Sequence, residues 1–146
     1  MKNRTGTILA IGFALAMACA PAASAQLAKS SRPLTAKEAK AELFGIDMTG
    51  FSITYGMQWR ECIDPKGETL YETPNGVQKG RMWIEEETGA ACFAYADSGY
   101  KDTGCFNVSR KGQGYQFEGQ FDGGIFATTS VVRAVKSCKP ADDLIG

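Results

Sequence analysis

The stretch AACFAYADSGYKDTGCFNV (residues 90–108) predicts a β-hairpin that carries one cysteine in each strand. The connecting loop is centred midway between Cys92 and Cys105, so the two cysteines lie directly opposite each other. Because side chains alternate along a strand, Phe93 and Phe106 then share the other face. The agreement of the apolar face with the cysteine face predicts a disulfide between Cys92 and Cys105.

The remaining cysteines extend this framework. The chain has five, and one of them, Cys19, belongs to the segment that we interpret as an export signal. The other four are an even number in an exported chain, which predicts two disulfides. By exclusion, Cys62 pairs with Cys138. No two cysteines have C-x-x-C spacing, so neither a zinc knuckle nor a thioredoxin-like redox motif is supported.

Short alternating runs separated by turn residues continue on both sides of the hairpin, a pattern typical of an all-β protein. We expect an antiparallel up-and-down meander of about eight strands, forming a small barrel or sandwich. The expected strands are 49–54, 57–62, 68–73, 80–86, 90–96, 104–109, 115–121 and 125–135. The expected core residues are Trp59, Trp83, Ile84, Phe93, Tyr95, Phe106, Val108, Tyr115, Phe117, Phe121, Phe126 and Val131.

One short helix is predicted before the strands, over residues 35–44. The run from Thr35 to Glu38 has the S/T-x-x-E form of a capping box, and Gly45 suits a helix end. We therefore expect a flexible leader over 26–34, a single domain over 35–138 that includes the helix, and a C-terminal tail over 139–146.

The first 25 residues have the form of a secretory signal peptide. Lys2 and Arg4 precede an apolar run, and small residues follow up to Ala25. Cleavage after Ala25 would deliver the chain to the periplasm or the exterior. The alternative is a lipoprotein anchored at Cys19, and only in that case do we expect association with a membrane.

Composition excludes several function classes. The chain has no histidine, so it has no imidazole base, no Ser-His-Asp or Cys-His catalysis and no His-containing zinc site. Its 16 basic and 16 acidic side chains give a net charge of zero, so no basic excess is available to hold a nucleic acid. We expect no catalytic residue, no metal and no cofactor.

Two groups of residues remain as candidates for function. The loop between the two cysteines is a reasonable place for a partner to bind, because loops on a rigid scaffold often carry binding. Its candidate residues are Asp97, Tyr100, Lys101 and Asp102. Four acids, Glu61, Asp64, Glu68 and Glu118, could meet in space for acid–base work, but their spacing singles out no pair.

Three features together carry a resemblance: the helix segment Leu34–Gly45, the run Gly80-Arg81-Met82-Trp83, and the two-cysteine hairpin. With these the chain resembles a group of small exported proteobacterial β-rich proteins of lipocalin-like build. Small lipocalin-like inhibitors of bacterial proteases and lysozyme share that build. The resemblance implies a fold and carries no activity with it.

The sequence thus favours a non-catalytic exported barrel that acts as a binding or inhibitory module. Its partner would be a protein or a small ligand. The many large aromatic residues are expected to fill the barrel, which favours recognition through loops. The alternatives are a carboxylate-dependent enzyme acting on cell-envelope glycans and a structural or lipid-anchored envelope component.

Overall fold

The computed structural model describes residues 32–96, 99 and 103–141. The predicted signal peptide, its cleavage site after Ala25 and the alternative anchor Cys19 lie outside these residues. So do the predicted partner-binding residues Asp97, Tyr100, Lys101 and Asp102.

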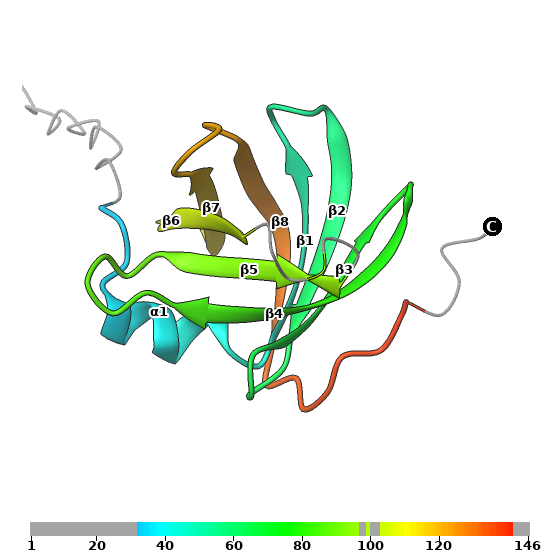
Figure 1. The fold of residues 1–146 in the computed structure, drawn as a ribbon, viewed down its shortest axis with the longest axis horizontal. Coiled ribbons are helices and arrows are strands. Elements are labelled where there is room, and N and C mark those ends of the chain that lie inside the picture. The colour runs from blue at the N-terminus through cyan, green and yellow to red at the C-terminus, as the bar shows by residue number, and fades with distance from the viewer. Residues whose placement is uncertain (1–31, 97–98, 100–102, 142–146) are drawn as a thin grey trace, which may run out of the picture.

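The described chain forms a closed barrel of eight antiparallel strands, preceded by one short helix (Figure 1). Each strand pairs with its neighbours in sequence, and the last strand pairs with the first. The elements are α1 (Ala36–Leu43), β1 (Ile46–Ser52), β2 (Met57–Ile63), β3 (Glu68–Thr73), β4 (Gly76–Ile84), β5 (Ala91–Tyr95), β6 (Thr103–Lys111), β7 (Gly114–Gly119) and β8 (Ile125–Arg133). The predicted all-β meander with an N-terminal helix is confirmed, and closure selects the barrel over the sandwich.

Two strands begin three or four residues earlier than the sequence pattern predicts. β1 begins at Ile46 rather than residue 49, because Gly45 ends the helix with a φ of 67° and the strand follows at once. β4 begins at Gly76 rather than Gly80. The first residues of β4 are largely exposed and polar. They therefore lack the alternation of apolar and polar residues that predicts a strand.

The helix starts as its capping box predicts. Thr35 is the N-cap: its hydroxyl accepts from the Glu38 amide, and the Glu38 carboxylate accepts from the Thr35 amide at 2.9 Å. Ala39 and Leu43 are fully buried, so this face of α1 packs on the barrel core. The helix lies across the end of the barrel where β4 ends and β5 begins (Figure 1).

Two residues that precede the helix, Pro33 and Leu34, are part of the folded domain. The Leu34 amide donates to the Val108 carbonyl at 2.7 Å, and Pro33 pairs with Ser109. Leu34 is buried in the same cluster as Ala39. The segment that we expect to be a flexible leader, 26–34, is therefore fixed at these two positions, and residues 26–31 lie outside the described part of the chain.

Two of the expected core residues lie outside the core. Trp83 is 37% exposed because it alternates with the inward-facing Met82 and Ile84 and so points outward. Phe121 is 87% exposed because β7 ends at Gly119, so the strand alternation does not extend to it. The other predicted core residues are buried or pack against the buried cluster.

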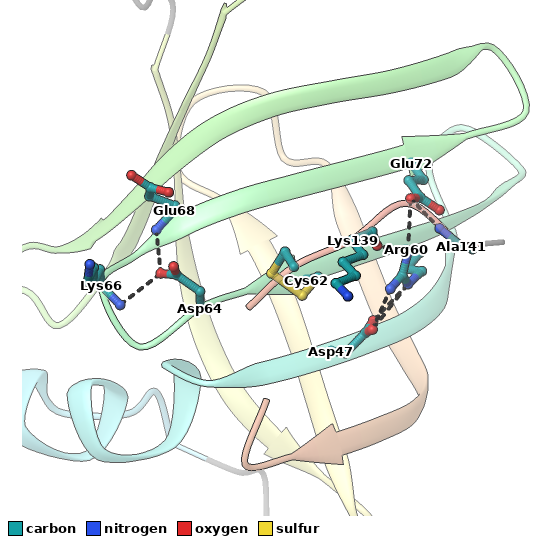
Figure 2. Close-up of a disulfide and its surroundings, with 10 residues drawn as sticks. Asp47, Arg60, Cys62, Asp64, Lys66, Glu68, Glu72, Lys139 and Ala141 are labelled. Carbon is teal, nitrogen blue, oxygen red and sulfur yellow. Dashed lines mark hydrogen bonds and ion pairs between the residues drawn. A yellow bond between two sulfur atoms is a disulfide. The ribbon is translucent and has the colours of Figure 1, made fainter. Parts of the chain in front are cut away.

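Both disulfides have the predicted pairing, Cys62–Cys138 and Cys92–Cys105. Cys62 faces outward from β2 yet is fully buried, because the C-terminal segment crosses over it (Figure 2). That segment is also bonded to the barrel. Arg60 donates to the Lys139 carbonyl at 3.2 Å, and the Ala141 amide donates to Glu72 at 3.0 Å.

Candidate ligand-binding cavity

The two ends of the barrel differ in how far side chains fill them. At the α1 end, Leu43, Ile63 and Tyr115 are almost wholly buried and close the interior. In the half away from α1, a partly open cavity of about 170 Å³ remains. Side chains therefore fill the interior at the α1 end, whereas the aromatic residues toward the other end leave part of it open.

The cavity wall is almost entirely aromatic. Seven rings, which we call the aromatic lining, come from β2, β3, β5, β6, β7 and β8. They are Trp59, Tyr71, Phe93, Tyr95, Phe106, Phe117 and Phe126. Met48, Glu61 and Gly104 complete the wall.

The rings hold one another in place by edge-to-face contacts. The Trp59 and Phe126 centroids are 6.2 Å apart with planes at 77°, and those of Phe106 and Phe126 are 5.6 Å apart at 88°. Such pairs are favoured because the positive edge of one ring meets the negative face of the other. The cavity is therefore bounded by rings that support each other.

Two glycines allow two of these side chains to lie close to the barrel wall. A Cβ on Gly50 would lie 2.5 Å from the Trp59 ring, and one on Gly80 would lie 2.6 Å from the Tyr95 ring. A Cβ on Gly50 would also lie 2.2 Å from the Ala127 carbonyl oxygen, and one on Gly80 would lie 2.6 Å from the Ala94 carbonyl oxygen. Any larger residue would push these rings inward, so Gly50 and Gly80 keep the interior open.

Glu61 is the single carboxylate of the cavity wall and is only 4% exposed. It lies on β2 between the inward-facing Trp59 and Ile63. The Tyr95 hydroxyl donates to its Oε2 at 2.8 Å. Burial raises the pKa of the Glu61 carboxyl to about 8, so the neutral acid predominates at pH 7.

Two buried polar atoms of the wall have no hydrogen-bond partner: Glu61 Oε1 and Trp59 Nε1. Buried polar groups are nearly always hydrogen-bonded, and leaving one unpaired costs about 1–3 kcal/mol. Both atoms belong to side chains that line the cavity.

No basic side chain belongs to the cavity wall. Arg60, next to Glu61, points to the outer face of the barrel, where it bonds Asp47 at 2.6 Å and Glu72 at 2.9 Å (Figure 2). The hydroxyls of Tyr95 and Thr69 act on the Glu61 carboxyl, and both lower its pKa against the larger effect of burial. Burial, reinforced by Glu61, raises the pKa of Tyr71 to about 12 and raises that of Tyr95 well above its usual range.

The four acids considered from the sequence do not come together. Glu61 is inside the barrel. Asp64 caps the β2–β3 turn, where its carboxylate accepts from the amides of Lys66 and Glu68 (Figure 2). The side chains of Glu68 and Glu118 are exposed. Among residues 32–96, 99 and 103–141, no group of three or more Cys, Asp or Glu side chains is placed to hold a metal ion.

The sequence contains a signal for the inward orientation of Glu61. In the alternating run from Met57 to Cys62, Glu61 follows Trp59 by two residues. It therefore lies on the same face of the strand as Trp59 and faces the core. A lone acid in the inward phase of a strand marks a buried carboxyl. Alternation could not show that space is left beside it, since this depends on contacts from six strands.

The hairpin loop that the sequence singled out begins and ends beside the cavity. Tyr95, at the end of β5, and Gly104, near the start of β6, both line it. Gly104 is also exposed to solvent. The described ends of the two strands that flank this loop therefore contribute to the cavity wall.

The site thus belongs to a small up-and-down barrel that is closed by a helix at one end and has an aromatic cavity toward the other. Comparisons with protein-family models, with curated proteins and with solved structures find no match. No helix in the described part of the chain is long and apolar enough to cross a membrane.

Proposed function

We propose that this protein is an exported, non-catalytic binding module that holds one small, mostly apolar molecule inside its barrel. The observation that carries the proposal is the partly open cavity of about 170 Å³ with its seven-ring lining. Apolar cavities of about 150 Å³ can stay dry and bind benzene, whereas sites for drug-sized ligands are typically about 300–1,000 Å³. The expected ligand is therefore about the size of one substituted aromatic ring.

Two features support the non-catalytic reading over a glycan-cleaving enzyme. Glycoside hydrolysis generally uses two carboxyl groups on either side of the scissile bond. The cavity wall has one, Glu61, and the other acids considered from the sequence lie elsewhere. An internal cavity of this size also has no room for a glycan chain.

Export is supported by the two disulfides, which fit an oxidising compartment. Cleavage after Ala25 is the proposed processing step, and Cys19 lipidation is the alternative. Mass spectrometry of the protein from its native host tests both. A mature chain starting at Gln26 supports export, and a lipid-modified Cys19 overturns the unanchored form.

Recognition of a protein through Asp97, Tyr100, Lys101 and Asp102 stays a prediction, as does the resemblance to small exported proteobacterial proteins. The cavity favours a small ligand as the primary partner. The strands that flank the loop supply Tyr95 and Gly104 to the wall of the cavity.

Tryptophan fluorescence offers a direct test with toluene as the probe. The chain has two tryptophans, Trp59 in the cavity wall and Trp83 on the outer face. In a Trp83→Phe variant, the remaining emission comes from Trp59 alone. We expect a saturable change on titration with toluene. The matched Trp59→Phe variant reports from Trp83 and should not respond.

The absence of any saturable response of Trp59 up to the solubility limit of toluene would overturn the proposal. A second measurement covers the case in which toluene binds without changing the fluorescence of Trp59. The ε-methyl of Met48, which lines the cavity, should shift in NMR spectra on adding toluene. The methyl of Met57, on β2 but outside the cavity wall, should shift much less.

A further inference from the structure

The cavity brings together an aromatic wall and one incompletely paired buried acid. This combination suits a ligand with a positive charge. Of the two Glu61 oxygens, Oε2 accepts from Tyr95 and Oε1 has no hydrogen-bond partner, while the Thr69 hydroxyl is near enough to lower the pKa of the carboxyl. No lysine or arginine lines the cavity to supply the missing charge.

We propose that the cavity binds a small monoamine, with the ammonium group on the Glu61 carboxyl and the apolar body among the rings of the aromatic lining. This rests on the proposed function, because it requires that the cavity holds a ligand at all. It adds the chemical class of that ligand and the residue that selects it.

The aromatic lining strengthens the case for a cation. The negative face of an aromatic ring attracts an ammonium within about 6 Å, and more strongly when the site is desolvated. Trp is the ring type that attracts a cation most strongly, and both Trp59 and Tyr95 line the cavity together with Glu61. Their rings are fixed close to the wall by Gly50 and Gly80.

Charge balance also favours an amine over an anion. A carboxylate ligand would bring a negative charge next to a buried carboxyl that is itself hard to ionise, where no described cation faces the cavity. Arg60 is held on the outer face by Asp47 and Glu72. An ammonium instead supplies the counter-charge that a buried carboxylate otherwise lacks.

A neutral ligand with an acceptor oxygen is the competing class, and pH separates the two. Burial holds the pKa of the Glu61 carboxyl near 8 in the free protein. The other titratable groups that act on this carboxyl are Tyr95 of β5, Tyr71 of β3 and Asp47 of β1. An ammonium binds the ionised acid and displaces its proton, whereas an acceptor oxygen binds the protonated acid.

The two classes therefore predict opposite pH dependences. For an amine, the dissociation constant at pH 6 should exceed that at pH 8 by about 50-fold, because the acid must first lose its proton. For an acceptor ligand, the dissociation constant should be flat up to pH 7 and rise above pH 8. The sign of the change decides between them.

The experiment measures binding of benzylamine, benzyl alcohol, acetophenone and toluene to the full mature chain by calorimetry at pH 6, 7 and 8. We expect benzylamine to bind most tightly at pH 8 and to lose about 50-fold at pH 6, while toluene shows no pH dependence. In the Glu61→Gln variant, benzylamine should bind no better than toluene, and its pH dependence should vanish.

Three results would overturn the amine proposal. Benzylamine could bind no more tightly than toluene at pH 8, Glu61→Gln could leave the preference for benzylamine intact, or acetophenone could bind best and weaken above pH 8. Toluene serves as the reference in each case. Toluene binding to both wild type and Glu61→Gln with no amine preference leaves the proposed function standing, whereas failure of all four probes removes both proposals.

Discussion

At the scale of single residues, Glu61 is the side chain whose presence packing does not explain. It is an acid inside an aromatic wall, with one oxygen unpaired. A buried carboxyl disfavours its own ionisation, so the folded protein holds a proton that the unfolded chain releases. The residue therefore lowers stability at neutral pH, and such a cost is typical of a functional group.

Replacing Glu61 by Gln should stabilise the protein, and more so as pH rises. The pKa of Glu61 is raised to about 8 in the folded protein, above its value in the unfolded chain. The contribution of the Glu61 carboxyl to the free energy of unfolding is thus fully present below about pH 4.5. It is lost as pH rises to about 8, by up to about 1.4 kcal/mol per pH unit. Gln cannot ionise and avoids this loss.

Urea unfolding at pH 5, 7 and 8 measures the effect. The free energy of unfolding of Glu61→Gln should exceed that of wild type by a few kcal/mol at pH 8 and by much less at pH 5. The control is Glu118→Gln, at an exposed position on β7. Equal pH dependence in Glu61→Gln and wild type would show that Glu61 is already ionised in the folded protein.

The same residue shows how far sequence reasoning reaches at this scale. Strand alternation places Glu61 and Trp59 on one face, and it places Trp83 outside once Met82 and Ile84 are taken as core. It fails at Phe121, where the strand ends before the pattern does. The unfilled space beside Glu61 cannot be predicted, because it depends on how rings from six strands meet.

At the scale of elements, β1 controls the shape of the cavity through one glycine. The pairing of β1 with β8 shifts between Thr49 and Gly50. At this point the strand comes so close to its surroundings that a Cβ on Gly50 would lie 2.2 Å from the Ala127 carbonyl and 2.5 Å from the Trp59 ring. The sequence shows a glycine in a strand, but not what approaches it.

Gly50→Ala should therefore move Trp59 into the cavity. We expect a loss of about 1–3 kcal/mol in the free energy of unfolding, which is typical of overpacking, and weaker binding of toluene. Both are measurable in the Trp83→Phe background, by urea unfolding and by toluene titration. Thr49→Ala, at the exposed neighbouring position, should change stability by less than about 0.5 kcal/mol. Unaltered toluene binding in Gly50→Ala would refute the role of this glycine.

The helix is attached to the barrel by polar contacts as well as by Ala39 and Leu43. Glu42 of α1 accepts from Arg110 of β6 and from the Tyr115 hydroxyl at 3.1 Å. Arg110, and then Tyr115, lower the pKa of Glu42 against the opposing effect of burial. The capping box predicted this helix and its start, but the partners of Glu42 lie about 70 residues away and leave no mark in the local sequence.

Glu42→Gln should weaken the attachment in a pH-dependent way. The pKa of Glu42 is lower in the folded protein than in the unfolded chain. The contribution of Glu42 to the free energy of unfolding is therefore present above the pKa of the unfolded chain and is lost as pH falls. We expect Glu42→Gln to lose about 1 kcal/mol at pH 7 and progressively less toward pH 3. Thermal unfolding across this range measures the difference, with Lys37→Gln on the exposed side of α1 as the control. A constant difference at all pH values would show that the charge of Glu42 is not involved.

At the scale of the whole molecule, two kinds of closure act together. Hydrogen bonds close the barrel where β8 pairs with β1, and a disulfide ties the C-terminal segment across the outer face of β2. The register of the hairpin and simple elimination were enough to predict both disulfides. They could not predict that the segment around Cys138 would cover Cys62 and bond Arg60 and Glu72, since it has no regular secondary structure to reveal its path.

The two disulfides should contribute unequally to stability. Cys62–Cys138 closes a separation of 76 residues and Cys92–Cys105 one of 13, so constraint of the unfolded chain gives about 4.5 and about 3 kcal/mol. Urea unfolding of Cys62→Ala/Cys138→Ala should therefore show the larger loss. Its dependence on urea should also change, because the C-terminal segment is freed. The matched variant Cys92→Ala/Cys105→Ala keeps its strands in register through the β5–β6 pairing and should unfold in one step at an intermediate urea concentration. A larger loss from this second variant would mean that the hairpin, rather than the C-terminal tie, limits the stability of the barrel.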